Sequence, residues 1–304
     1  MTGLVPYRPG LEEVKRLVLD AVSSASTRTM YGRALADFFR WREEQGRPAF
    51  SRAAVQAHRA ALETRGYAAS TINQRLAAIK KLAREAAANW FIDAETAAAI
   101  DQVTGVKQSG VRAGNWLTRA QAEALINCPD PATLKGKRDR AILALLVGCG
   151  LRRAEAAVLT VVDIQQRDGR WAIVDLRGKH GRIRTVAVPA WVKHAVDLWC
   201  QAASICEGKI LRGMNRHGQI TGDSISPQAV LAVVAGYGRQ LGFNLKPHDL
   251  RRTCAKLCRA GGGELEQIQL LLGHASVQTT ERYLGTRLNL ADAPNDRLGL
   301  EWDS

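Results

Sequence analysis

The chain has 304 residues, more than one hydrophobic core usually organises, so we expect two domains. With 46% hydrophobic and 24% charged residues, its composition is that of a globular protein and excludes a disordered or fibrous chain. Its 43 Lys and Arg residues against 29 Asp and Glu residues leave a formal net charge of +14, which favours a nucleic-acid partner, because neutralising phosphates releases counterions.

Residues 10–101 predict a group of short amphipathic helices. The segment 26–29 offers hydroxyl side chains to cap a helix whose apolar residues recur at helical spacing, and the Gly-Arg-Pro sequence at 46–48 ends it. Ser51 is the predicted cap of the next helix. The first hundred residues therefore predict a helical domain.

A third helix in this region has one apolar and one cationic face. It follows Gly66 and the candidate caps Ser70 and Thr71. The apolar face carries Ile72, Leu76, Ile79, Leu82 and Ala83. The cationic face carries Arg75, Lys80, Lys81 and Arg84. Such a helix can pack on a small core while it contacts phosphates, so we predict that these four residues bind DNA. A solvated basic face is the competing interpretation.

The segment 103–115 predicts a linker. It is rich in Gly and polar residues, includes Lys107 and Arg112, and breaks the helical spacing. A linker of this length lets two lobes close around a duplex like a clamp.

The second domain is predicted to begin at 116. Thr118 and Gln121 form a candidate capping box, and another helix is expected at 136–149. Alternating apolar residues at 171–176 and 183–189, joined by a Gly-rich turn, predict a β-hairpin. The rest is helical, with breaks at 212–223 and 260–263. The expected fold class is mainly α with a small β-sheet.

The six cysteines include no CxxC pair and no disulfide framework. Cys254 and Cys258 share a helix face, but no second ligand pair stands nearby, so buried thiols are favoured over a metal site. The N-terminal residues do not resemble a signal peptide, and the longest apolar run, 141–147, is too short to cross a bilayer. We therefore expect a cytoplasmic protein without a membrane partner.

Three segments of the chain carry residues suited to attack on a phosphodiester. Such an enzyme must neutralise charge on the nonbridging oxygens, present a nucleophile in line and protonate the leaving oxygen. Arg152 and Arg251 are the predicted pair for the first task, because a guanidinium is always charged and offers phosphate a planar fork. Lys179, at the tip of the predicted hairpin, is the predicted proton donor to a 5′ oxygen.

The remaining roles fall to the last quarter of the chain and to one acid. Tyr283 is the predicted nucleophile, since surrounding positive charge eases ionisation of a phenol, and His248 takes or relays its proton. His274 is predicted to donate a hydrogen bond to a phosphate oxygen, and Glu155 to orient the cations without touching DNA. Each residue alone has an ordinary explanation in packing or at the surface, but their joint order favours strand cleavage through a phosphotyrosine.

With these residues the chain resembles the tyrosine recombinases of the phage integrase family over nearly its whole length. The motifs are Gly-Leu-Arg-x-x-Glu at 150–155, the Gly-Lys hairpin, His-Asp-Leu-Arg-Arg-Thr at 248–253 and Leu-Leu-Gly-His-x-x-x-x-Thr-Thr-x-x-Tyr at 271–283. The resemblance implies a C-shaped clamp, with a helical SAM-like core-binding domain at 10–102 and a catalytic domain with a C-terminal tail at 116–304. By the same resemblance the catalytic residues are Arg152, Lys179, His248, Arg251, His274 and Tyr283. His180, Arg252 and Cys254 depart from common family residues but remove no catalytic group.

The resemblance also implies the reaction and its partners. Tyr283 joins a 3′ phosphate and releases a 5′ hydroxyl, which attacks a partner strand, without ATP, a catalytic metal or another cofactor. Family members act on double-stranded DNA recombination sites as tetramers, through a Holliday junction. The implied homotetramer is joined by exchange of C-terminal tails, for which the chain offers the apolar residues Leu288, Leu290, Leu298, Leu300 and Trp302.

Several functions remain open at this point. Integration or excision of a mobile element is the preferred one, and Xer-type resolution of chromosome or plasmid dimers is the alternative. A type IB topoisomerase uses similar cations and a tyrosine. A catalytically silent DNA-binding regulator on the same fold belongs to another functional class, and the intact residue set argues against it.

Overall fold

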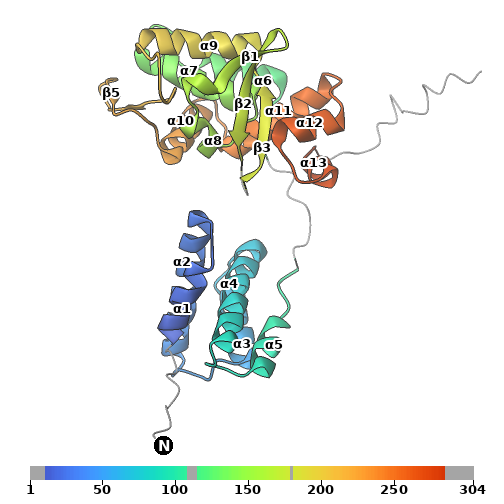
Figure 1. Cartoon of the computed structure of the whole chain (residues 1–304). Coiled ribbons are helices and arrows are strands. Elements are labelled where there is room, and N and C mark those ends of the chain that lie inside the picture. Colours follow the sequence, from blue (N-terminus) through green and yellow to red (C-terminus); the bar gives the residue numbers. More distant parts are fainter. Residues whose placement is uncertain (1–10, 108–114, 179–180, 285–304) are drawn as a thin grey trace, which may run out of the picture. The chain divides into compact units, whose positions relative to one another are not determined.

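The computed structural model describes residues 11–107, 115–178 and 181–284, without the side chains of 11, 12, 282 and 283. The chain divides into two compact units, Met1–Val111 and Arg112–Ser304, and each is described by itself (Figure 1). The predicted fold class, mainly helical with small sheets, is confirmed. The predicted linker lies mostly outside the described residues, and the domain limits at 102 and 116 stay predictions. No helix in the described ranges is long and apolar enough to span a membrane.

The first unit packs its helices around one central helix. Its elements are α1 (Leu11–Asp20), α2 (Ala25–Glu44), α3 (Arg52–Thr64), α4 (Ala69–Ala88) and α5 (Ala94–Asp101). Helix α4 packs against each of the other four. The apolar face predicted for it is confirmed, because Ile72, Leu76, Ile79, Leu82 and Ala83 are all buried.

Two of the predicted helix starts in this unit are wrong. The cap of α2 is Ser24, whose side chain accepts from the Thr27 amide, so 26–29 lies inside the helix. Helix α4 begins after its N-cap residue Ala68, two residues beyond the left-handed Gly66, which leaves Ser70 and Thr71 in its first turn. At α2 several hydroxyls stand close together and Ser24 makes the capping bond, whereas α4 begins without a side-chain cap. The cap at Ser51 is confirmed.

The second unit surrounds a buried helix with further helices and a small sheet. Helix α6 (Arg119–Asn127) begins with the predicted Thr118–Gln121 capping box. Helix α7 (Leu134–Gly148) is the core helix, since every residue from 141 to 147 is buried, and α9 (Ala190–Ala202) packs against it. The remaining helices are α8 (Arg153–Val158), the 3-10 helix η1 (Val161–Asp163), α10 (Pro227–Gln240), α11 (Pro247–Ala260), α12 (Leu265–Leu272) and α13 (Val277–Leu284).

The sheet of the second unit contains the predicted hairpin and one unpredicted strand. Strands β2 (Arg170–Arg177) and β3 (Ile183–Ala187) are antiparallel, with a register shift between Ile173 and Leu176. Strand β1 (Ile164–Arg167) pairs with the other edge of β2. The predicted break at 212–223 contains a second short hairpin, β4 (Gly213–Met214) and β5 (Ile220–Thr221).

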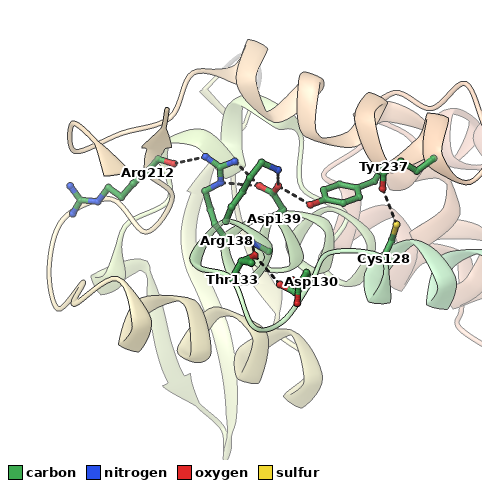
Figure 2. A network of polar contacts seen from close by, with 10 residues as sticks. Cys128, Asp130, Thr133, Arg138, Asp139, Arg212 and Tyr237 are labelled. Carbon is green, nitrogen blue, oxygen red and sulfur yellow. Dashed lines mark hydrogen bonds and ion pairs between the residues drawn. The ribbon is translucent and has the colours of Figure 1, made fainter. Parts of the chain in front are cut away.

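A buried carboxylate joins α7 to α10. Asp139 is fully buried and accepts from Lys135 at 2.5 Å, from Arg138 Nε and Nη2 at 2.9 and 2.7 Å, and from the Tyr237 hydroxyl at 3.0 Å (Figure 2). Arg138 also donates to the Arg212 carbonyl at 3.5 Å. Since α7 leads directly into the segment with Arg152 and α10 into the segment with His248, this network fixes the frame that carries both.

Candidate active site

The turn after α7 places Arg152. Gly150 has a φ of +59°, and a Cβ at this position would lie 3.0 Å from a Leu272 methyl and 3.3 Å from the Cys254 sulfur, so only glycine fits. Arg152 then caps α8, and its backbone amide donates to Glu155 Oε2 at 2.8 Å. The tight turn thus brings the end of α7 against α11 and α12 and directs Arg152 from the start of α8.

Glu155 is a buried carboxylate held between two guanidinium groups. Its Oε1 accepts from Arg152 Nη1 at 2.6 Å and from Arg184 Nη1 at 2.9 Å, and its Oε2 accepts from Arg184 Nη2 at 2.8 Å. Burial raises the pKa of Glu155, but hydrogen bonds from Arg184 and Arg152 outweigh it and lower the pKa to about 2. The acid is therefore ionised and bonded to both cations, while its expected role, to orient the catalytic cations without touching DNA, stays a prediction.

Arg184 was not predicted as a site residue. It lies on β3 in register with Val186 and Val188, which are both buried, so the alternation places a charged residue on the apolar face of the strand. That mismatch was the available signal. Its side chain is only 8% exposed, and its Nε donates to the Leu271 carbonyl at 3.0 Å.

Arg251 joins two loops of the site from α11. It is 1% exposed, and it donates through Nη1 to the Gly150 carbonyl at 2.5 Å and through Nη2 to the Leu272 carbonyl. The guanidinium therefore holds the turn before Arg152 and the end of α12 together. His248 lies one turn earlier on the same helix, as its spacing predicts.

Two histidines complete the described part of the site. His274 follows the left-handed Gly273, and its Nδ1 lies 3.0 Å from Oγ1 of the buried Thr280. Burial, followed by the charges of Arg251 and Arg152, lowers the pKa of His274 to about 4. Burial and the charge of Arg252 also lower the pKa of His248. Both imidazoles are therefore neutral near pH 7, which suits one to accept a proton and the other to donate a hydrogen bond.

Two cavities meet at Arg152. One, of about 260 Å³, is lined by Arg152, Arg182, Arg184 and His274, among others. The other, of about 420 Å³, is lined by Arg152, Lys246, His248 and Arg251, among others. The structure thus brings together Arg152, Glu155, His248, Arg251 and His274 from segments that are far apart in the chain. The arrangement is a cationic recess with neutral proton carriers, which can bind a phosphodiester and transfer protons.

The other two predicted catalytic residues are Lys179 and Tyr283. Lys179 falls outside the described residues, as does His180. Gly178, just before it, is close to the site, since a Cβ there would lie 3.4 Å from Arg152 Nη1. Tyr283 is on α13, which packs against α11 and α12, and its side chain is not described.

The predicted DNA-binding cations of α4 all have partners inside the first unit. Arg75 pairs with Asp37 and lies 4.4 Å from the Tyr67 ring centre, and Lys80 donates to the Asp101 carbonyl at 2.6 Å. Lys81 pairs with Glu85 at 2.7 Å, and Arg84 with Asp101 at 2.8 Å. Arg84 is 61% exposed and Arg75 only 19%. DNA contact by these residues stays a prediction.

The cysteines and potential metal ligands give no second site in the described ranges. All six cysteines are free thiols, of which Cys149 and Cys254 are buried and Cys206 is exposed. No group of three or more His, Cys, Asp or Glu side chains among the described residues is placed to hold a metal ion.

Two family models match the chain. The one described as Phage integrase family matches residues 115–288, and the one described as Phage integrase, N-terminal SAM-like domain matches residues 14–89. Each match lies within one of the two compact units.

Similar proteins include named recombinases. A tyrosine recombinase of Synechococcus elongatus is 29% identical over 288 residues, which are 89% of this chain and 88% of that protein. The tyrosine recombinase XerD of Bifidobacterium longum is 29% identical over 279 residues, 86% of each chain. Among solved structures, a lambda integrase dimer bound to a COC' core site has a TM-score of 0.69 at 18% identity, covering 97% of this chain and 96% of that one. That last likeness concerns the fold.

Proposed function

The chain belongs to the phage integrase family of tyrosine recombinases and is a site-specific recombinase, and we propose that it cleaves and rejoins DNA through a 3′-phosphotyrosine on Tyr283. The observation that carries this proposal is the cationic recess at Arg152, bordered by His248, Arg251 and His274. A recess of this kind stabilises the charge that builds on a phosphodiester as it is attacked.

The first step is cleavage of one strand. The Tyr283 oxygen attacks phosphorus and loses its proton to His248, whose lowered pKa makes it neutral and able to accept. The bond from phosphorus to the 5′ oxygen breaks, and Lys179 supplies the proton that this oxygen takes. Arg152 and Arg251, which line the same cavity, neutralise the nonbridging oxygens, and His274 donates a hydrogen bond to one of them.

The second step reverses the first on a new partner. The 5′ hydroxyl of another strand attacks the phosphotyrosine, a new phosphodiester forms, and the Tyr283 phenol is released with a proton. One ester replaces another in each step, so the bond energy is retained and neither ATP nor a catalytic metal is required. Repetition on the second pair of strands passes through a Holliday junction.

The proposed partners are DNA recombination sites and further copies of the chain. A related fold, the lambda integrase dimer, is bound to a core site, which supports a duplex partner here. The net charge of +14 favours the same partner. We propose a homotetramer on DNA joined by the C-terminal tail, although residues 285–304 lie outside the described ones.

We propose integration or excision of a mobile element as the biological role. The similarity to XerD of Bifidobacterium longum supports the alternative, resolution of chromosome or plasmid dimers. Recombination between two copies of a candidate site, in the presence and absence of a second recombinase, would separate the roles.

A nicked suicide duplex, drawn from a random-site pool, tests the chemistry. Wild type is expected to form a covalent protein–DNA adduct on a denaturing gel without metal or ATP, and Tyr283→Phe is not. Tight DNA binding without an adduct would instead support a silent regulator. Relaxation of supercoiled DNA without a specific site would support a topoisomerase.

A further inference from the structure

Arg184 joins three parts of the proposed active site through one side chain. It projects from β3, donates two hydrogen bonds to Glu155 at the start of α8, and donates a third to the Leu271 carbonyl in the last turn of α12. Given the proposed function, we propose that Arg184 is a positioning residue that keeps Arg152 available to the phosphate and holds the His274 turn in place.

The first part of the argument is electrostatic. Glu155 is 4% exposed, and its Oε1 accepts from both Arg152 and Arg184. With two guanidinium groups and one carboxylate, the trio keeps a net charge of +1 beside the smaller cavity. Without Arg184 the buried carboxylate would have Arg152 as its remaining guanidinium partner, and the pair would be neutral. The charge offered to a phosphate would then fall, and Arg152 would be drawn toward Glu155.

The second part concerns the turn that carries His274. Gly273 lies directly on the Arg184 side chain, since a Cβ there would come within 2.8 Å of Arg184 Cδ. The bond to the Leu271 carbonyl fixes the end of α12 two residues earlier. Arg184 is also one of the charges that lower the pKa of His274. It therefore both locates this imidazole and favours its neutral form.

The third part is the shape of the donor. Arginine can make a parallel two-bond contact with a carboxylate and still donate through Nε to a third acceptor, which is the arrangement seen here. Lysine retains the charge but cannot span all three acceptors. Lysine at this position should therefore restore the electrostatic effect more than the geometric one.

The experiment compares single-turnover cleavage of the suicide duplex by wild type, Arg184→Gln and Arg184→Lys at saturating DNA. Arg170→Gln is the matched control, because Arg170 is exposed at the far end of the same hairpin. We expect Arg184→Gln to cleave about 100-fold more slowly, the order seen when a catalytic group is misplaced, with unchanged DNA affinity. Arg184→Lys should recover part of the rate, and Arg170→Gln should match wild type.

Two further readouts distinguish positioning from folding. Arg184 acts partly through Glu155. Substitution of Arg184 should therefore reduce the cleavage rate less in a Glu155→Gln protein than in wild type. Guanidinium ion should restore part of the rate of Arg184→Ala.

A wild-type cleavage rate in a folded Arg184→Gln would overturn the inference. So would rate losses that simply multiply in the double variant, or no rescue of Arg184→Ala by guanidinium ion. If Arg184→Gln does not fold, Arg184→Lys decides by the same readouts. If wild type itself forms no adduct, the proposed function fails instead, and the role of Arg184 falls with it.

Discussion

The Nδ1 atom of His274 lies 3.0 Å from Oγ1 of Thr280, a fully buried hydroxyl on α13. Thr280 stands one turn before Tyr283, so this contact joins the proposed phosphate-binding imidazole to the helix of the proposed nucleophile. The contact between Nδ1 and Oγ1 fixes the orientation of the His274 ring.

Thr280→Val tests this contact. The variant preserves the side-chain shape but leaves the Nδ1 side of the ring without its hydroxyl, which costs about 1–3 kcal/mol for a buried polar group. We expect slower single-turnover cleavage with a small loss in thermal stability. Thr280→Ser should restore the rate, and equal rates in Thr280→Val and wild type would contradict the assignment.

Gly273→Ala tests the turn before His274. A left-handed residue with a Cβ costs about 1–2 kcal/mol, and here the Cβ would also come within 2.8 Å of Arg184 Cδ. Gly242→Ala is the matched control, since Gly242 has a φ of +78° with open space around it. Urea unfolding should show a larger loss in the free energy of unfolding for Gly273→Ala than for Gly242→Ala. Of the two variants, Gly273→Ala alone should also lose cleavage activity. Equal effects of the two substitutions would show that the close approach is unimportant.

Asp139→Ala tests the network that joins α7 to α10. Removing the carboxylate leaves Arg138 buried without its ion partner, which costs about 3–5 kcal/mol. Asp197→Ala is the control, because Asp197 is 54% exposed and its pair with Lys193 is worth less than about 1 kcal/mol. Chemical denaturation of both variants checks the difference. If Asp139→Ala lost no more unfolding free energy than Asp197→Ala, the network would contribute little to stability.

His58 predicts acid sensitivity of the first unit. It is fully buried between Phe38 and Trp41, at ring distances of 5.1 and 5.0 Å, and burial is the main cause that lowers its pKa to about 4. Asp37 nearby raises the pKa, while Arg75 and Arg65 lower it further. As the pH falls from 6.5 to 4, the unfolded chain takes up the proton and the folded chain does not. Stability is therefore full above 6.5 and falls by up to about 3 kcal/mol by pH 4.

His58→Leu provides the comparison for that acid sensitivity. Leucine keeps an apolar side chain against the two rings and removes the titrating group. Urea unfolding at pH 7 and pH 5 should show a smaller pH effect in His58→Leu than in wild type. The same pH effect in both proteins would assign the sensitivity to other groups.

The sequence predicted those features that depend on neighbouring residues. The apolar face of α4 and the β2–β3 hairpin follow from periodicity. The α2 cap was misplaced because several hydroxyls stand close together at 23–29. Strand β1, with the polar sequence Ile-Gln-Gln-Arg, is defined by its pairing with β2 rather than by its own composition.

The site residues that the sequence missed depend on tertiary contacts. Arg184 is buried because Glu155, 29 residues away in the chain, meets it at the strand. The hydroxyl of Thr280 acquires its partner when the turn at Gly273 reverses the chain. A charged residue in step with the buried Val186 and Val188 marks Arg184 in the sequence but does not identify its partner. The Thr280 contact leaves no local pattern, since the packed structure brings its groups together.

The two carbonyls held by Arg251 belong to Gly150 and Leu272, residues 122 positions apart in the chain. Leu272 must therefore have emerged from the ribosome before Arg251 can bond to both carbonyls. A nascent chain that has exposed Arg152 but not yet the end of α12 lacks the assembled recess. The recess is therefore a property of the whole second unit and not of a partial translation product.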